Sequence, residues 1–149
     1  MSGYLLDTNA ISILAPKSEK RKAPSADVSA LQNWIREHDD EVYLSSVTLA
    51  EIQAGISKLA RTGATRRAAD LSHWLTAILE LHEARTLPLT SPVALEAGRL
   101  LDRAIGSGTN PGFEDAAIAA TAAVHGLTIV TENARHFERF GVPFISPRM

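Results

Sequence analysis

The sequence predicts an α/β protein, a three-layer α/β/α sandwich around a short-stranded, mostly parallel central sheet. Short apolar runs alternate along the chain with longer stretches of helical apolar spacing, a pattern typical of strands joined by helical crossovers. The helical stretches dominate, which favours a sheet covered by helices. The chain has 149 residues, about the length of one domain, and no linker or repeat divides it. We therefore expect a single domain over residues 1–149.

Five short apolar runs are predicted to form the strands, at residues 3–6, 41–45, 85–89, 127–130 and 142–145. The third run contains a proline, which cannot donate to a sheet ladder, so we expect it at an edge. Seven stretches are predicted to be helical, at residues 9–14, 28–38, 47–61, 66–81, 92–105, 114–125 and 133–140. Apolar residues at helical intervals, such as Ile52, Ile56 and Leu59, give each longer helix one face for the core.

The composition describes a globular protein and excludes several kinds of site. Hydrophobic residues make up 45% of the chain and charged residues 21%. The absence of cysteine excludes a disulfide framework, a thiolate nucleophile and a zinc site built on sulfur. A net charge of −2 argues against a DNA-binding protein that coats many phosphates. No apolar run reaches the roughly 18 residues of a membrane helix, and the first residues do not resemble a secretory signal. We therefore expect a cytoplasmic protein without membrane contact.

Four polar residues are predicted to meet at one edge of the sheet. In a parallel sheet the ligand site lies beyond the carboxyl ends of the strands. Asp7 ends the first strand, and Glu51 lies in the first turns of the helix after the second. Asp115 opens the alanine-rich helix, and Asn133 follows the fourth strand. Three carboxylates and one amide would form a site of oxygen ligands, which suits Mg²⁺ or Mn²⁺.

Each of these residues also has a purely structural explanation. Asp7 is a favoured N-cap residue for the helix that follows it. Glu51 lies three positions after Thr48, which is the spacing of a capping box. Asp115 would be stabilised by the helix macrodipole, and Asn133 is also an ordinary N-cap residue. It is the coincidence of all four at one sheet edge that favours a shared site.

The chain resembles a known family through four segments that occur in a fixed order. They are Leu-Leu-Asp-Thr-Asn-Ala-Ile-Ser at 5–12, Ser-Ser-Val-Thr-Leu-Ala-Glu-Ile-Gln-Ala-Gly-Ile at 45–56, Phe-Glu-Asp-Ala-Ala-Ile-Ala-Ala-Thr-Ala at 113–122 and Thr-Glu-Asn-Ala-Arg-His-Phe at 131–137. Together they resemble the PIN-domain ribonucleases, in particular the VapC-type toxins of bacterial toxin–antitoxin pairs. The resemblance covers essentially the whole chain.

The resemblance implies a metal-dependent endoribonuclease that hydrolyses RNA phosphodiester bonds. Asp7, Glu51, Asp115 and Asn133 would form the catalytic set, with Asp7, Glu51 and Asp115 holding Mg²⁺ or Mn²⁺. Asn133 falls where many members carry a fourth acid and others carry Asn or Ser, which leaves the number of bound metal ions open. The implied partners are an RNA substrate, a cognate antitoxin protein that blocks the site, and a second copy of the chain in a homodimer.

Electrostatics supports a cation among these acids, since clustered carboxylates repel one another unless a cation neutralises them. A bound divalent ion polarises a phosphoryl oxygen or activates a water. Two groups of cationic or titratable residues are candidates to bring RNA to the site: Lys17, Lys20, Arg21 and Lys22, and the later group Arg135, His136 and Arg139. The first group is equally explained as a solvated loop, and His136 is interpreted as a surface histidine.

Two other functions are compatible with the same residues. Asp7 could be the phosphate-accepting nucleophile of a phosphatase similar to the haloacid dehalogenases. Such enzymes usually carry a second Asp two residues later, where this chain has Asn9. Alternatively, the chain is a non-catalytic module that binds RNA or a partner, although the intact set of Asp7, Glu51 and Asp115 argues against loss of catalysis.

Overall fold

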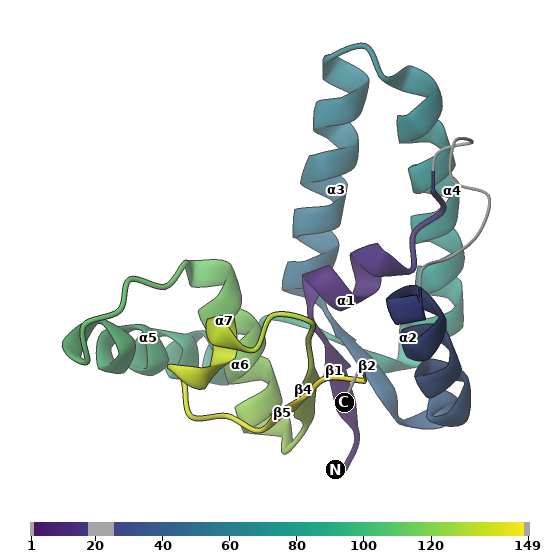
Figure 1. Ribbon diagram of the computed structural model, residues 1–149. Coiled ribbons are helices and arrows are strands. Elements are labelled where there is room, and N and C mark those ends of the chain that lie inside the picture. The colour runs from purple at the N-terminus through teal and green to yellow at the C-terminus, as the bar shows by residue number, and fades with distance from the viewer. Residues whose placement is uncertain (1, 18–25, 148–149) are drawn as a thin grey trace.

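The computed structural model describes residues 2–17 and 26–147 (Figure 1). Within them, five parallel strands form a sheet in the order β3-β2-β1-β4-β5. The strands are β1 (Tyr4–Leu6), β2 (Val42–Ser45), β3 (Thr86–Leu87), β4 (Thr128–Val130) and β5 (Phe144–Ile145). The predicted parallel sheet is therefore confirmed, and the proline-containing run does lie at an edge, as β3.

The helices follow the predicted order with small shifts at their ends. They are α1 (Thr8–Ile13), α2 (Ala26–Glu37), α3 (Ser46–Arg61), α4 (Thr65–His82), α5 (Ser91–Gly106), α6 (Phe113–His125) and α7 (Arg135–Glu138). The last of them is a single turn, shorter than the stretch predicted at 133–140. Of the first basic group, Lys17 is exposed and the other three residues lie outside the described part of the chain.

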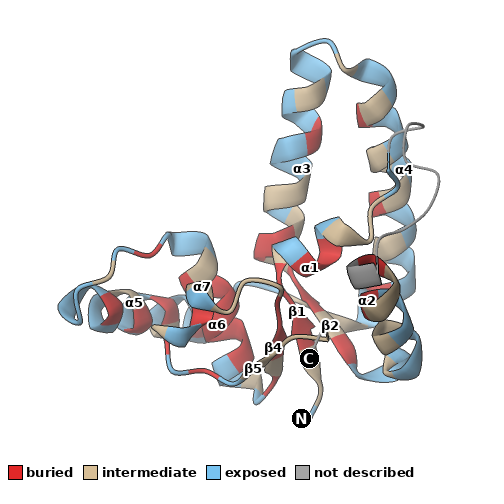
Figure 2. Cartoon of the chain, viewed as in Figure 1, coloured by how far each residue is buried: buried red, intermediate tan, exposed pale blue. Residues whose placement is uncertain are grey.

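The two faces of the sheet are covered by different helices, which confirms the three-layer sandwich. Side chains alternate between the faces along each strand. Leu5 and Ile129 belong to a core shared with α5, α6 and α7, whereas Leu6 and Val130 belong to a second core shared with α1 and α2. Figure 2 shows the buried residues concentrated in the sheet and in α6. Every residue of α6 from 116 to 122 is buried, and small alanines there let the helix pack closely.

Helices α3 and α4 form a long hairpin that projects away from the sheet (Figure 1). A separate small core around Ile56, Ala68 and Leu75 holds the two helices together. Their outer surfaces are largely exposed (Figure 2). Within the described residues, no helix is both long and apolar enough to cross a membrane.

Candidate active site

A polar pocket lies where the carboxyl ends of β1 and β4 meet the first turns of α1, α3 and α6. The backbone N–H of Asp7 continues the pairing of these two strands by donating to Val130 O at 3.1 Å. Seven residues line the pocket: Asp7, Thr8, Asn9, Glu51, Glu114, Asp115 and His136. Three of the four predicted site residues are thus brought together, from elements far apart in the sequence. The fourth, Asn133, is not among the lining residues.

Asp7 is the most deeply buried acid of the pocket, with only 3% of its surface exposed. Its Oδ1 accepts a hydrogen bond from Ala10 N at 2.7 Å, so Asp7 is indeed the N-cap of α1. Its Oδ2 accepts from the Thr131 hydroxyl at 2.5 Å. Burial raises the pKa of Asp7 to about 6, against the opposing effect of the two hydrogen bonds. Asp7 is therefore both a structural cap and a destabilised charge, which a nearby cation would stabilise.

Glu51 points into the pocket from α3, and its structural explanation as part of a capping box is wrong. Ser45 is the N-cap of α3, with its side chain accepting from Val47 N at 3.1 Å. Thr48 is fully buried, and its hydroxyl lies 3.3 Å from that of Thr8. The Thr8 hydroxyl donates to Glu51 Oε1 at 2.6 Å. Burial is the main cause that raises the pKa of Glu51, and neighbouring carboxylates add to it.

Asp115 lies in the first turn of α6, as the sequence predicts, and is paired with two donors from the segment after β4. Its Oδ2 is 3.2 Å from Nδ1 of His136 and 3.4 Å from Nη2 of Arg139. Burial raises the pKa of Asp115, while His136 and Arg139 act in the opposite direction. The macrodipole of α6 also favours an acid here.

Asn133 reaches the pocket indirectly. It is not an N-cap, because the cap of α7 is Ala134. Its backbone N–H donates to the Thr131 hydroxyl at 2.9 Å, and its side-chain Nδ2 lies 3.0 Å from Nε2 of His136. His136 lines the pocket and contacts Asp115, so its interpretation as a simple surface histidine is incomplete.

Glu114 is a fourth pocket carboxylate, and the sequence pattern did not single it out. It is exposed, and it contributes to the raised pKa of both Glu51 and Asp115. The signal for it is its position beside Asp115 in the acidic first turn of α6. A pair of acids there is also explained by the macrodipole, so the sequence pattern alone does not distinguish an acid that stabilises the helix from one that belongs to the pocket.

The donor chemistry of the pocket fits a hard divalent cation. Carboxylate oxygens are the ligands that Mg²⁺ and Mn²⁺ prefer. In the described part of the chain, no three Asp, Glu or His side chains lie close enough together to hold a metal ion as they stand. Instead, hydroxyl, imidazole and guanidinium donors engage Asp7, Glu51 and Asp115. A cation would replace some of these donors and offset the burial that raises the three pKa values.

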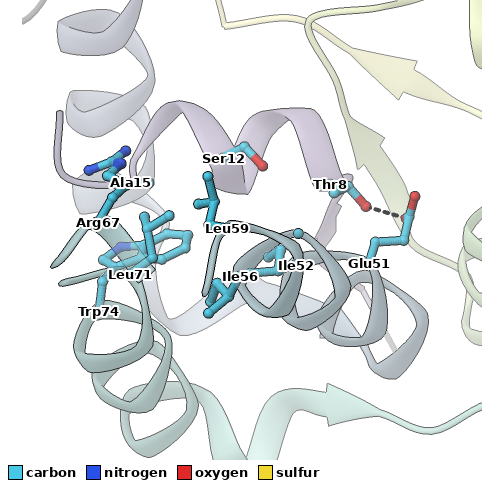
Figure 3. A pocket seen from close by; sticks show the side chains of 11 residues that line it. Thr8, Ser12, Ala15, Glu51, Ile52, Ile56, Leu59, Arg67, Leu71 and Trp74 are labelled. Atoms are coloured by element: carbon cyan, nitrogen blue, oxygen red, sulfur yellow. Dashed lines mark hydrogen bonds between the residues drawn. The ribbon is translucent and has the colours of Figure 1, made fainter. Parts of the chain in front are cut away.

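A second, mostly apolar groove begins beside this pocket (Figure 3). It shares Thr8 and Glu51 with the acidic pocket and runs between α1, α3 and α4. Its remaining lining residues are Ser12, Ala15, Ile52, Gly55, Ile56, Leu59, Arg67, Leu71 and Trp74. Figure 3 shows Glu51 and Arg67 at opposite ends of the labelled set. The groove thus joins an acidic end to a basic end across an apolar middle.

The parallel sheet and the acids at its edge define an α/β domain with a candidate metal site, and comparison with known proteins identifies its family. The family model of the PIN domain matches residues 4–143. The chain is 32% identical over 143 residues to "VapC ribonuclease Y4jK" of Sinorhizobium fredii, covering 96% of both chains. It is 31% identical over 144 residues to "Toxin FitB" of Neisseria gonorrhoeae, again covering 96% of both chains.

A solved structure agrees with these sequence relatives. The crystal structure of FitAcB from Neisseria gonorrhoeae superposes with a TM-score of 0.80 at 31% identity, covering 97% of this chain and 98% of that one. The chain therefore belongs to the PIN domain family. This membership removes the ground for a haloacid-dehalogenase-like phosphatase, because that alternative depended on Asp7 alone.

Proposed function

We propose that this protein is a Mg²⁺- or Mn²⁺-dependent endoribonuclease that serves as the toxin of a toxin–antitoxin pair. One observation carries the proposal: Asp7, Glu51 and Asp115 come from three separate elements, line one pocket, and all have a raised pKa. Perturbed carboxylates gathered in a cleft are typical of a functional site. The names of the sequence relatives, a VapC ribonuclease and a toxin, support RNA as the substrate.

Asp7, Glu51 and Asp115 would hold the cation directly or through water. When bound, such an ion polarises a phosphoryl oxygen and activates a water for attack. The protein's own contribution is to present the three carboxylates with fixed orientation. Thr131 holds Asp7 at one oxygen, and Thr8 holds Glu51. Arg139 lies beside Asp115, where a guanidinium can also attract the phosphate of an approaching RNA strand.

The apolar groove beside the pocket is where we propose that the cognate antitoxin binds. A peptide segment with apolar side chains would cover Ile56, Leu71 and Trp74. A basic side chain of that segment, placed near Glu51, would pair with the acids and block access to them. The family resemblance supports this mode of inhibition, and it also supports a homodimer as the functional assembly.

The direct test is RNA cleavage by the purified protein after removal of any bound antitoxin. Total RNA is incubated with Mg²⁺ or Mn²⁺, beside an EDTA control and the variant Asp7→Asn. We expect discrete fragments that require the metal and disappear in the variant. A folded protein that binds Mn²⁺ but cleaves RNA neither in a total-RNA sample nor in a cellular extract would contradict the nuclease proposal. It would then favour a non-catalytic module that binds RNA or a partner.

A further inference from the structure

His136 lies between Asp115 and Asn133, two residues of the predicted site. Its Nδ1 is 3.2 Å from Oδ2 of Asp115, and its Nε2 is 3.0 Å from Nδ2 of Asn133. Asp115 belongs to α6, whereas Asn133 and His136 both belong to the segment after β4, so the imidazole reaches from its own segment to a second element. The ring also lines the acidic pocket, although 43% of the side chain is exposed.

In the neutral ring, the two contacts together assign the proton to one of the two nitrogens. Nδ2 of Asn133 offers only hydrogens, so Nε2 of His136 must accept. A neutral imidazole that accepts at one nitrogen carries its proton on the other. Nδ1 therefore donates to Asp115, and Asn133 selects the tautomer that makes this donation possible.

The backbone around His136 is itself held in place. Its N–H donates to Asn133 O at 3.1 Å, and its carbonyl accepts from Nε of Arg139 at 3.1 Å. Arg139 also reaches Oδ2 of Asp115, from 3.4 Å. Two donors from one short segment thus converge on the same carboxylate oxygen and fix the rotation of the carboxylate group.

We propose that His136 is a positioning residue for Asp115, and that Asn133 acts on the site through His136. The inference rests on the proposed function, in which Asp115 is a ligand of the divalent cation. Residues that orient metal ligands through hydrogen bonds typically contribute 10- to 100-fold to metal affinity. An imidazole suits this role, because its planar ring offers one directed N–H donor to the carboxylate.

Replacing His136 by asparagine or by glutamine tests the proposal, because the two side chains place their amides at different positions. An asparagine at position 136 places its amide near the location of Nδ1, whereas a glutamine places it near that of Nε2. The readout is Mn²⁺ affinity, measured by calorimetry on the antitoxin-free protein. We expect His136→Ala and His136→Gln to weaken binding about 10-fold or more. His136→Asn should keep most of the wild-type affinity, since it restores the donor to Asp115.

Two further samples complete the series. Asn133→Leu removes the group that fixes the tautomer and should weaken Mn²⁺ binding, although less than His136→Ala does. His73→Ala, which removes an exposed histidine on α4, is the matched control and should leave the affinity unchanged.

Nitrogen-15 spectra of the metal-free protein report the tautomer itself. They should show the His136 proton on Nδ1, and Asn133→Leu should shift it toward Nε2.

The outcomes separate this inference from the nuclease proposal. Wild-type affinity in His136→Ala, equal weakness of His136→Asn and His136→Ala, or a proton on Nε2 would each overturn the positioning role. Failure of the wild-type protein to bind Mn²⁺ would overturn it as well. If the series behaves as expected and the wild-type protein still cleaves no RNA, the nuclease proposal fails while the role of His136 stands.

Discussion

The Thr131 hydroxyl donates a 2.5 Å hydrogen bond to Oδ2 of Asp7, although the two residues are 124 positions apart in the sequence. Asp7 follows β1 and Thr131 follows β4, and these strands are adjacent and parallel. The bond therefore ties together the two strand ends beneath the acidic pocket. It also favours the charged form of the most buried acid, and so opposes the effect of burial on its pKa.

Replacing Thr131 with Val should harm both stability and metal binding. Valine keeps the shape of threonine but leaves a buried carboxylate oxygen without its donor, which typically costs about 1–3 kcal/mol. We expect a lower free energy of unfolding in urea at pH 7 and a weaker affinity for Mn²⁺. Thr131→Ser, which keeps the hydroxyl, is the control and should lose much less. Equal behaviour of the Val and Ser variants would show that the hydrogen bond is unimportant.

The raised pKa of Asp7 predicts an unusual pH dependence of stability in the metal-free protein. The folded pKa is about 6 and the ordinary value is 3.8. Below the ordinary value Asp7 is protonated in both states and carries no penalty. As pH rises from the ordinary value through the folded pKa, the unfolded state releases its proton first, so stability falls. The full shift corresponds to about 3 kcal/mol at neutral pH.

The variant Asp7→Asn isolates this effect, because its amide cannot ionise. Free energies of unfolding would be measured in urea with EDTA, for both proteins, at pH 4.5 and pH 7. We expect the free energy of unfolding of the wild-type protein, relative to that of Asp7→Asn, to be lower at pH 7 than at pH 4.5. A difference that stays constant with pH would mean that Asp7 is not destabilised by its burial.

A divalent metal ion should offset the destabilisation that the buried charge of Asp7 causes at neutral pH. A cation that binds only the folded state stabilises it, by about 2.7 kcal/mol at a hundredfold excess over its Kd. We expect Mn²⁺ to raise the thermal unfolding temperature at pH 7, and to raise it less at pH 5, where protons compete for the same oxygens. Asp115→Asn should show a much smaller shift. A shift of the same size in that variant would place the binding site elsewhere.

The elements of this fold could be predicted because their signals are local. The runs before Asp7 and around Ile129 are short, apolar and bounded by polar residues, which describes buried strands of a parallel sheet. Asp7 could be placed for the same reason, since it directly follows such a run. The helix predicted at 133–140 extends beyond α7 at both ends, since the spacing of apolar residues does not reveal that the chain makes only one helical turn there.

The partners within the site could not be predicted, because they depend on how separate elements meet. Nothing near Glu51 shows that its partner is the Thr8 hydroxyl on α1, and the spacing to Thr48 suggested a cap that Ser45 provides instead. His136 has no special local pattern, yet the packing of α7 beside α6 brings it to Asp115. Side chains that act across elements thus become visible only in the three-dimensional structure.

Gly55 allows the groove to be tested separately from the acids. It lies on α3 and lines the apolar groove, and a methyl group on its Cα would meet no heavy atom within 4 Å beyond its own stretch of helix. Gly55→Gln should therefore fold well, and it also removes a poor helix former. A side chain here would occupy the space proposed for the antitoxin. Overpacking of about 1–3 kcal/mol would weaken antitoxin binding roughly 5- to 150-fold.

The matched control is Gly98→Gln on α5, where a glycine is also exposed and equally unobstructed. Antitoxin affinity would be measured by calorimetry or surface plasmon resonance for both variants, with RNA cleavage by the antitoxin-free protein followed in parallel. We expect Gly55→Gln to lose antitoxin affinity and keep cleavage, and Gly98→Gln to keep both. If Gly55→Gln binds the antitoxin as the wild-type protein does, the antitoxin does not occupy this groove. Inhibition would then have to act at the acidic pocket by another route.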